Sequence, residues 1–195
     1  MSDTSLIPMF PLTLLPLPGE LVPLHIFEPR YKQLLEDAET TDISFGIFLN
    51  HDCNTQRLGS LMKLESVIKR YPAGESDIVL RCIDIFSMGK LYRTYKSKLY
   101  PGGDVKSWNI DAQAMPGVEV YEMFLLFQEK RKINRHFTAF TLYQVATELN
   151  LDLVDRYKLV TLPHQKKESF LLNHLRFQLH VISREEKSKD VFHLN

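Results

Sequence analysis

Glycine and proline, the residues that most often end helices and strands, are concentrated in the part of this chain that precedes residue 118. All 8 glycines lie there, and of the 10 prolines only Pro163 lies beyond it. Because such residues limit the length of regular elements, the first part favours short strands and the second part favours long helices. The sequence therefore predicts an α+β fold, with a strand-rich subdomain over residues 1–117 and a helical subdomain over residues 118–195, together forming one domain.

The strand-rich part opens with a run from Ile7 to Phe27 in which prolines are scattered among apolar residues. Proline lacks the N–H that a sheet ladder requires. We therefore expect edge strands or extended segments here, and no central strand. A short amphipathic helix should begin at Pro29, because apolar residues then recur at helical spacing as far as Ala38.

Further strands are indicated by short apolar runs between turn residues. They are expected over residues 45–49, 61–70, 77–86 and 90–100, with a hairpin at 71–76, a bend at Met88–Gly89 and a turn at 101–104. A series of short strands separated by turns is typical of a small barrel, closed or half-open.

After residue 117 the apolar residues recur with the period of a helix. The four expected helices run from Val118 to the basic run 130–132, from a cap at Thr138 to Leu149, from a cap at Asn150 or Asp152 to Leu162, and from His164 to about Lys187. Their apolar faces predict a helical bundle.

Composition excludes several classes of protein. Lys plus Arg and Asp plus Glu both number 24, so the net charge is zero, which argues against a dedicated binder of nucleic acid. Cys53 and Cys82 form no CxxC pair, so we expect reduced thiols. No apolar run reaches the roughly 20 residues of a membrane span, and the first residues lack the basic start of a signal peptide. We expect a soluble cytoplasmic protein.

Two segments near the N-terminus carry a resemblance. Residues 7–12 read IPMFPL, and residues 27–31 read FEPRY after a Pro-Gly-Glu turn at 18–20. Together they closely resemble the opening of the Lon protease N-terminal domain. The resemblance implies a PUA-like β-barrel followed by a C-terminal helical bundle subdomain, acting as the substrate-recognition part of an ATP-dependent protease. The chain departs from the family at Cys82 and Ile85, where members usually carry Gly and Arg.

The catalytic signatures of a full Lon protease are not found in this sequence. No G-x-x-x-x-G-K-[ST] phosphate loop occurs, since the run 87–90 lacks both the upstream Gly and the following hydroxyl. No Ser–Lys pair or nucleophile elbow can be placed in a pocket, which argues against a hydrolase. We therefore expect a standalone Lon substrate-binding-domain protein that is not an enzyme and needs no cofactor.

Two groups of residues are candidates for binding. The first is the junction between a strand and the first helix, which contains His25, Phe27, Glu28, Arg30 and Tyr31. The same residues would also serve a purely structural junction, because such a junction needs a helix start, a charge pair and a packed ring.

The second candidate group is basic and aromatic: Lys90, Tyr92, Arg93 and Tyr95, followed by further lysines and Tyr100. Such a row on a strand could follow a phosphate backbone while its rings stack on bases. It could equally be an exposed strand whose lysines discourage edge pairing. A third group, His51 with Cys53, has no partner ligands at metal-binding spacing, so we expect a loop there.

These observations leave two functional hypotheses. The first is a non-catalytic module that binds unfolded or apolar polypeptide segments, or a partner protein, in a groove between barrel and helices, by apolar contacts and strand addition. The alternative is an RNA-binding PUA-like protein that uses the 90–100 segment, an analogy of fold that the zero net charge disfavours. No membrane partner is expected, and the oligomeric state is open.

Overall fold

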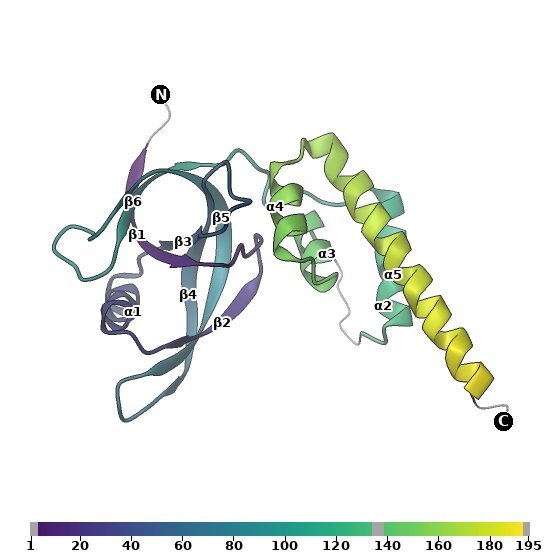
Figure 1. Ribbon diagram of the computed structural model, residues 1–195, viewed down its shortest axis with the longest axis horizontal. Helices are drawn as coiled ribbons and strands as arrows, with labels where there is room; N and C mark the ends of the chain where they lie inside the picture. Colours follow the sequence, from purple (N-terminus) through teal and green to yellow (C-terminus); the bar gives the residue numbers. More distant parts are fainter. Residues whose placement is uncertain (1–3, 134–138, 193–195) are drawn as a thin grey trace. The chain divides into compact units, whose positions relative to one another are not determined.

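The computed structural model describes residues 4–133 and 139–192, with side chains as far as residue 185. Two units are distinguished by their internal contacts, Met1–Ala112 and Gln113–Asn195. In the described residues, the first unit holds six strands and one helix, and the second holds four helices (Figure 1). The α+β fold expected from the distribution of glycine and proline is confirmed.

Five strands of the first unit close into a ring, and a sixth, β2 (Leu21–Ile26), pairs with one of them outside it (Figure 1). The strands of the ring are β1 (Ser5–Leu12), β3 (Phe45–Leu49), β4 (Leu58–Arg70), β5 (Ser76–Tyr92) and β6 (Gly102–Ser107). The order of all six is β2-β5-β4-β3-β1-β6, and a further pairing of β5 with β6 closes the ring. The length of β5 makes this closure possible, because its first part pairs with β2 and its last part pairs with β6. The predicted barrel is confirmed.

The expectation that no central strand precedes residue 27 is wrong for β1, although β2 does pair on one side only. β1 pairs with β6 through Ser5–Pro8 and with β3 through Met9–Leu12, so each half of the strand is paired on one side. The Met9 N–H donates to the Pro101 carbonyl beside β6 (2.8 Å). Because backbone groups alternate along a strand, both Pro8 and Pro11 direct their nitrogens to the unpaired side, which is why a proline-containing strand fits inside this barrel.

The expectations for residues 88–104 are wrong in part: Lys90–Tyr92 are strand as expected, and the register shifts between Met88 and Leu91, where a bend was expected, but the strand does not reach Tyr100. β5 continues through Met88–Gly89 to Tyr92, residues 93–100 form turns in place of a strand, and Gly102 begins β6 in place of a turn. The glycines serve close packing here. A Cβ atom at Gly102 would lie 3.1 Å from the Tyr95 ring, and one at Gly103 would lie 2.7 Å from the end of the Met9 side chain.

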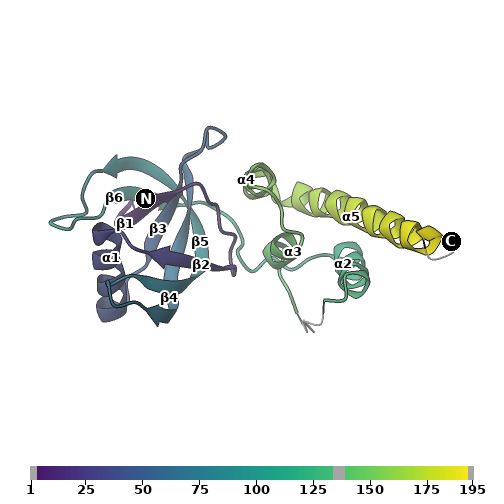
Figure 2. The same cartoon turned by 60° about the horizontal axis from the view of Figure 1, so that its bottom comes forward.

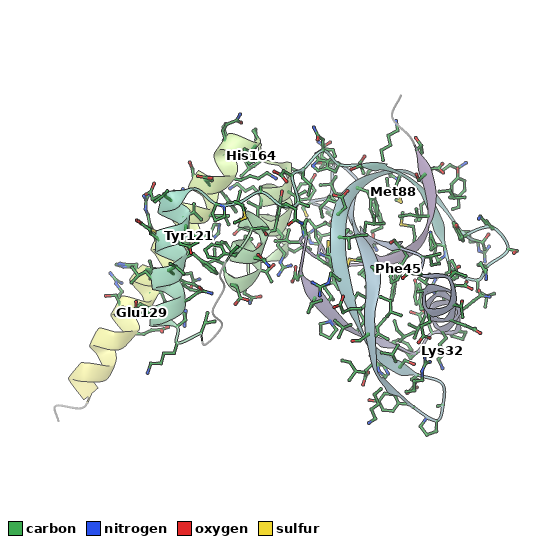
Figure 3. All side chains as sticks on the ribbon, turned by 180° about the vertical axis from the view of Figure 1, so that it is seen from behind. Lys32, Phe45, Met88, Tyr121, Glu129 and His164 are labelled. Carbon is green, nitrogen blue, oxygen red and sulfur yellow. The ribbon has the colours of Figure 1, made fainter. Side chains whose placement is uncertain are left out.

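The first helix, α1 (Pro29–Thr41), lies against the barrel (Figures 1 and 2). Its buried residues are those that the helical spacing predicted: Tyr31, Leu34, Leu35 and Ala38. The Tyr31 ring stacks on Phe10 of β1 with 3.8 Å between ring centroids. Met9, the neighbour of Phe10, belongs instead to a cluster with Phe86 and Met88, so β1 is buried on both of its faces. Figure 3 labels Phe45 and Met88 on the barrel.

The helices of the second unit are α2 (Val118–Lys130), α3 (Leu142–Glu148), α4 (Leu153–Thr161) and α5 (His164–Phe192). α3 is capped by Thr141, whose hydroxyl accepts from the Gln144 N–H in a capping box; the cap expected at Thr138 lies outside the described residues. Of the two candidates for the next cap, Asp152 is the one used. α5 extends beyond the expected end at residue 187. No described helix is long and apolar enough to cross a membrane.

Candidate binding surface

The junction between β2 and α1 divides the first candidate group into buried and exposed members. Tyr31 is only 5% exposed, and burial is the main reason that its pKa is raised. Glu28 and Arg30 pair with each other, with 2.8 Å between Oε2 and Nη2, and the Arg30 guanidinium lies over the Tyr31 ring. Phe27, in contrast, is 58% exposed. Within residues 27–31, the Phe27 ring is therefore accessible to a ligand and the Tyr31 ring is not.

His25 belongs to a hydrogen-bonded cluster that its place in the sequence did not suggest. Its Nδ1 atom lies 2.7 Å from Oδ1 of Asp77, the residue directly opposite on β5. The Tyr71 hydroxyl donates to the other oxygen of Asp77 (2.6 Å), and Glu75 lies 3.9 Å from His25 Nε2. The hydrogen bonds from Tyr71 and then His25 lower the pKa of Asp77, so this carboxylate is charged at neutral pH.

Alternate residues along β2 and just beyond it are exposed: Leu21, Pro23, His25 and Phe27. Successive side chains of a strand point to opposite faces, so these four lie on one face, and the His25 and Phe27 rings stack with 6.1 Å between centroids. We call these four residues the β2 surface. The sequence reasoning selected His25 and Phe27 and missed Leu21 and Pro23, although the alternation of a strand could have indicated them.

The second candidate group does not form one row. Lys90 and Tyr92 lie in β5, whereas Arg93 and Tyr95 lie in the turns that follow. The Tyr92 hydroxyl donates to Asp104 (2.6 Å), and the Tyr95 ring stacks on Tyr100. These rings are held by neighbours within the unit and are not arranged as a platform for bases.

The turns after β5 are fastened to α1 through Asp37. Its two oxygens accept hydrogen bonds from Lys98 (2.8 Å) and from the Tyr100 hydroxyl (2.6 Å). Burial acts to raise the pKa of Asp37, but these hydrogen bonds outweigh burial and the pKa is lowered. One of the lysines of the expected basic row therefore serves an internal ion pair.

The two cysteines are free thiols. Cys82 is buried, and burial raises the pKa of its thiol far above the ordinary value, so it is not a nucleophile at neutral pH. Cys53 lies in a loop where its N–H donates to His51 Nδ1 (3.2 Å). Among the residues that the structure describes, no three histidine, cysteine or acidic side chains gather as metal ligands would.

Comparison with known proteins places this geometry in a family. Residues 6–182 match the family described as the substrate-binding domain of ATP-dependent protease La (Lon). A Lon N-terminal domain protein from Xanthomonas campestris has a similar structure, with a TM-score of 0.66 and 24% identity over 86% of this chain and 97% of that one. The N-terminal domain of Mycobacterium avium complex Lon protease aligns with a TM-score of 0.49 and 13% identity over 92% of this chain and 98% of that one. A search of curated proteins found no significant match. Because the family match spans most of the sequence, the chain belongs to the Lon substrate-binding domain family.

Proposed function

We propose that this chain binds unfolded or apolar polypeptide segments and catalyses no reaction on them. The observation that carries the proposal is the family match, because the matched family is by description the substrate-binding part of an ATP-dependent protease and the match runs over residues 6–182. The description of that family names substrate binding and no catalytic step.

The surface of the barrel unit supports the same proposal. Leu21 is 50% exposed and Phe27 is 58% exposed, and both belong to the β2 surface. Exposed apolar side chains of this kind, grouped on one strand, favour a partner that is itself apolar. The zero net charge gives a polyanion no long-range attraction to the chain. RNA binding has less support, since Tyr92 and Tyr95 are engaged by Asp104 and Tyr100.

Fluorescence anisotropy tests this function directly. One labelled apolar peptide and one labelled single-stranded oligonucleotide are titrated with the protein, each at low and at moderate salt. We expect the peptide to bind at micromolar concentrations or above, because an extended peptide must be ordered on binding, and to bind almost equally at both salt concentrations. Oligonucleotide binding that persists at moderate salt, with no peptide binding, would reverse the choice of ligand.

The non-catalytic part of the proposal needs a separate measurement. The purified protein is incubated with ATP and with an unfolded protein, and phosphate release and peptide products are followed. We expect neither. ATP turnover that co-purifies with the chain through successive columns would show that it carries an activity of its own.

A further inference from the structure

We propose that the β2 surface is the docking site for an extended client segment whose alternate apolar side chains are followed by a lysine or arginine. This inference rests on the proposed function and names its site and its substrate class. It is carried by the spacing of the exposed side chains, by the free edge of β2, and by the carboxylates beside one end of the surface.

The spacing matches an extended peptide. The exposed positions from Leu21 to Phe27 recur at every second residue, which in a strand is a repeat of about 7 Å. An extended client places its own alternate side chains at the same repeat. Leu21 at one end and Phe27 at the other are about half exposed or more, so both can contact apolar side chains of the client.

The edge of β2 limits how the client is held. Within the described residues β2 pairs only with β5. The Cys82 N–H donates to the Glu20 carbonyl (3.0 Å), so the backbone carbonyl of Glu20 faces β5. From Leu21 to Ile26 the pairing of β2 with β5 has no register shift. Alternation then directs the backbone groups of Leu21, Pro23 and His25 to the free edge. Because Pro23 has no N–H, an added strand would lack one ladder hydrogen bond, so side-chain contacts must supply most of the affinity and the selectivity.

The carboxylates beside His25 select the charge of the client. Asp77 is already engaged by Tyr71 and His25, whereas the Glu75 carboxylate lies 3.9 Å from the histidine ring. Lys69 lies over the Tyr71 ring and the Lys32 ammonium donates to the Ala73 carbonyl (3.0 Å). Among the described residues neither lysine forms an ion pair with Glu75, so its carboxylate remains able to pair with a cation of the client. The exposed Phe27 ring beside it can also accept a cation on its face. A lysine or arginine in the client is the complementary group.

The test compares peptides and variants in the intact chain. The probes are labelled peptides of alternating leucine and threonine that end in lysine, in glutamate or in glutamine. We expect the lysine peptide to bind best and the glutamate peptide worst. Phe27→Ala should weaken binding of all three peptides about tenfold, and Leu21→Thr about threefold. Glu75→Gln should weaken only the lysine peptide, by about threefold.

Phe177→Ala provides a matched control, because Phe177 on α5 is 62% exposed and lies outside the β2 surface; it should bind as the unaltered protein does. Leu21, Phe27 and Phe177 are exposed and Glu75 is partly exposed, and circular dichroism melting curves establish that each variant is folded. Binding that is equal in every variant would overturn this site and leave the proposed function standing. If none of the three peptides binds, both the proposed site and the proposed function are overturned. A dimer in sedimentation that Leu21→Thr dissociates would make a second copy the occupant and overturn the client.

Discussion

Lys167 is a lysine buried where lysines are rarely found. It lies on α5 and is 4% exposed; its ammonium donates to the Tyr143 hydroxyl (2.9 Å) and lies 3.4 Å from the Val160 carbonyl near the end of α4. Its neighbours in the structure are thus a phenol and a helix carbonyl. Desolvation lowers its pKa from 10.5 to about 8, because a buried ammonium loses hydration that these dipoles do not fully replace.

This shift makes the stability of the protein depend on pH in a defined direction. In the unfolded chain the lysine holds its proton up to about pH 10.5, whereas the folded chain releases it near pH 8. Between these values the unfolded state binds more protons, so the free energy of unfolding rises with pH. At 1.36 kcal/mol for each unit of pKa, the protonated lysine lowers the free energy of unfolding at pH 7 by roughly 3 kcal/mol.

Replacing Lys167 with methionine should remove that penalty. The variant loses the hydrogen bonds to the Tyr143 hydroxyl and to the Val160 carbonyl, which together cost about 1–2 kcal/mol, so a net gain of about 1–2 kcal/mol at pH 7 is expected. At pH 10 the unaltered lysine is largely neutral in the folded state, and the difference between the two proteins should almost vanish. Urea unfolding followed by circular dichroism at pH 7 and pH 10 measures both quantities.

Lys166→Met is the matched control, because Lys166 is the exposed neighbour on the same helix. Subtracting its pH dependence removes the contributions of tyrosines and other groups that titrate over the same range. The reasoning is refuted if Lys167→Met lowers the free energy of unfolding by the same amount at both pH values. That result would mean that the ammonium is well solvated or well paired in the folded protein.

Three further predictions concern the barrel unit. Tyr31→Ala should lower the free energy of unfolding by about 3–5 kcal/mol, because the ring is buried against Phe10; thermal melting with unchanged stability would contradict this packing. Gly59→Ala should cost about 1–3 kcal/mol, since the new Cβ would lie 2.6 Å from the Ile47 carbonyl oxygen, and expression with a normal melting temperature would refute the close approach. The pKa of Asp37 is lowered in the folded protein, so its ionised carboxylate stabilises the folded state. This contribution is complete at pH values above the ordinary pKa of 3.8, and it is lost as the pH falls through the lower pKa of the folded state. Limited proteolysis should therefore cut the 93–100 turns faster at a pH below the folded-state pKa of Asp37 than at neutral pH. In the Asp37→Asn variant, these turns should be cut at neutral pH as fast as those of the unaltered protein are cut at acid pH.

Local patterns predicted the helices better than the strand pairings, and particular residues show why. The buried face of α1 follows from the spacing of Tyr31, Leu34, Leu35 and Ala38, which is a property of neighbouring residues. The role of β1 depends on which half of the strand meets β3 and which half meets β6. No local rule contains that information, so the rule that proline marks an edge gave the wrong position for β1.

The same distinction applies to the candidate surface. Phe27 could be selected from the sequence because it begins a family motif, and His25 because it lies beside that motif, but Asp77, the partner of His25, is 52 residues away in the chain. The contact exists because β2 and β5 pair in the register that sets these two residues opposite each other. The turns after β5 were misread for a similar reason: Tyr95 packs on Tyr100 and Gly102, and this packing ends the strand early.

The motif at residues 27–31 then has two separable physical roles. Pro29 begins α1, Glu28 and Arg30 pair with each other, and Tyr31 packs on the barrel; these four residues fix the direction in which the chain leaves β2. Because the chain enters the helix there, Phe27 is held at the end of the strand with its ring exposed and stacked on His25. A residue held by a rigid junction loses little conformational freedom on binding. The junction thus serves the proposed binding function indirectly, by presenting Phe27 in a fixed position beside the carboxylates of Glu75 and Asp77.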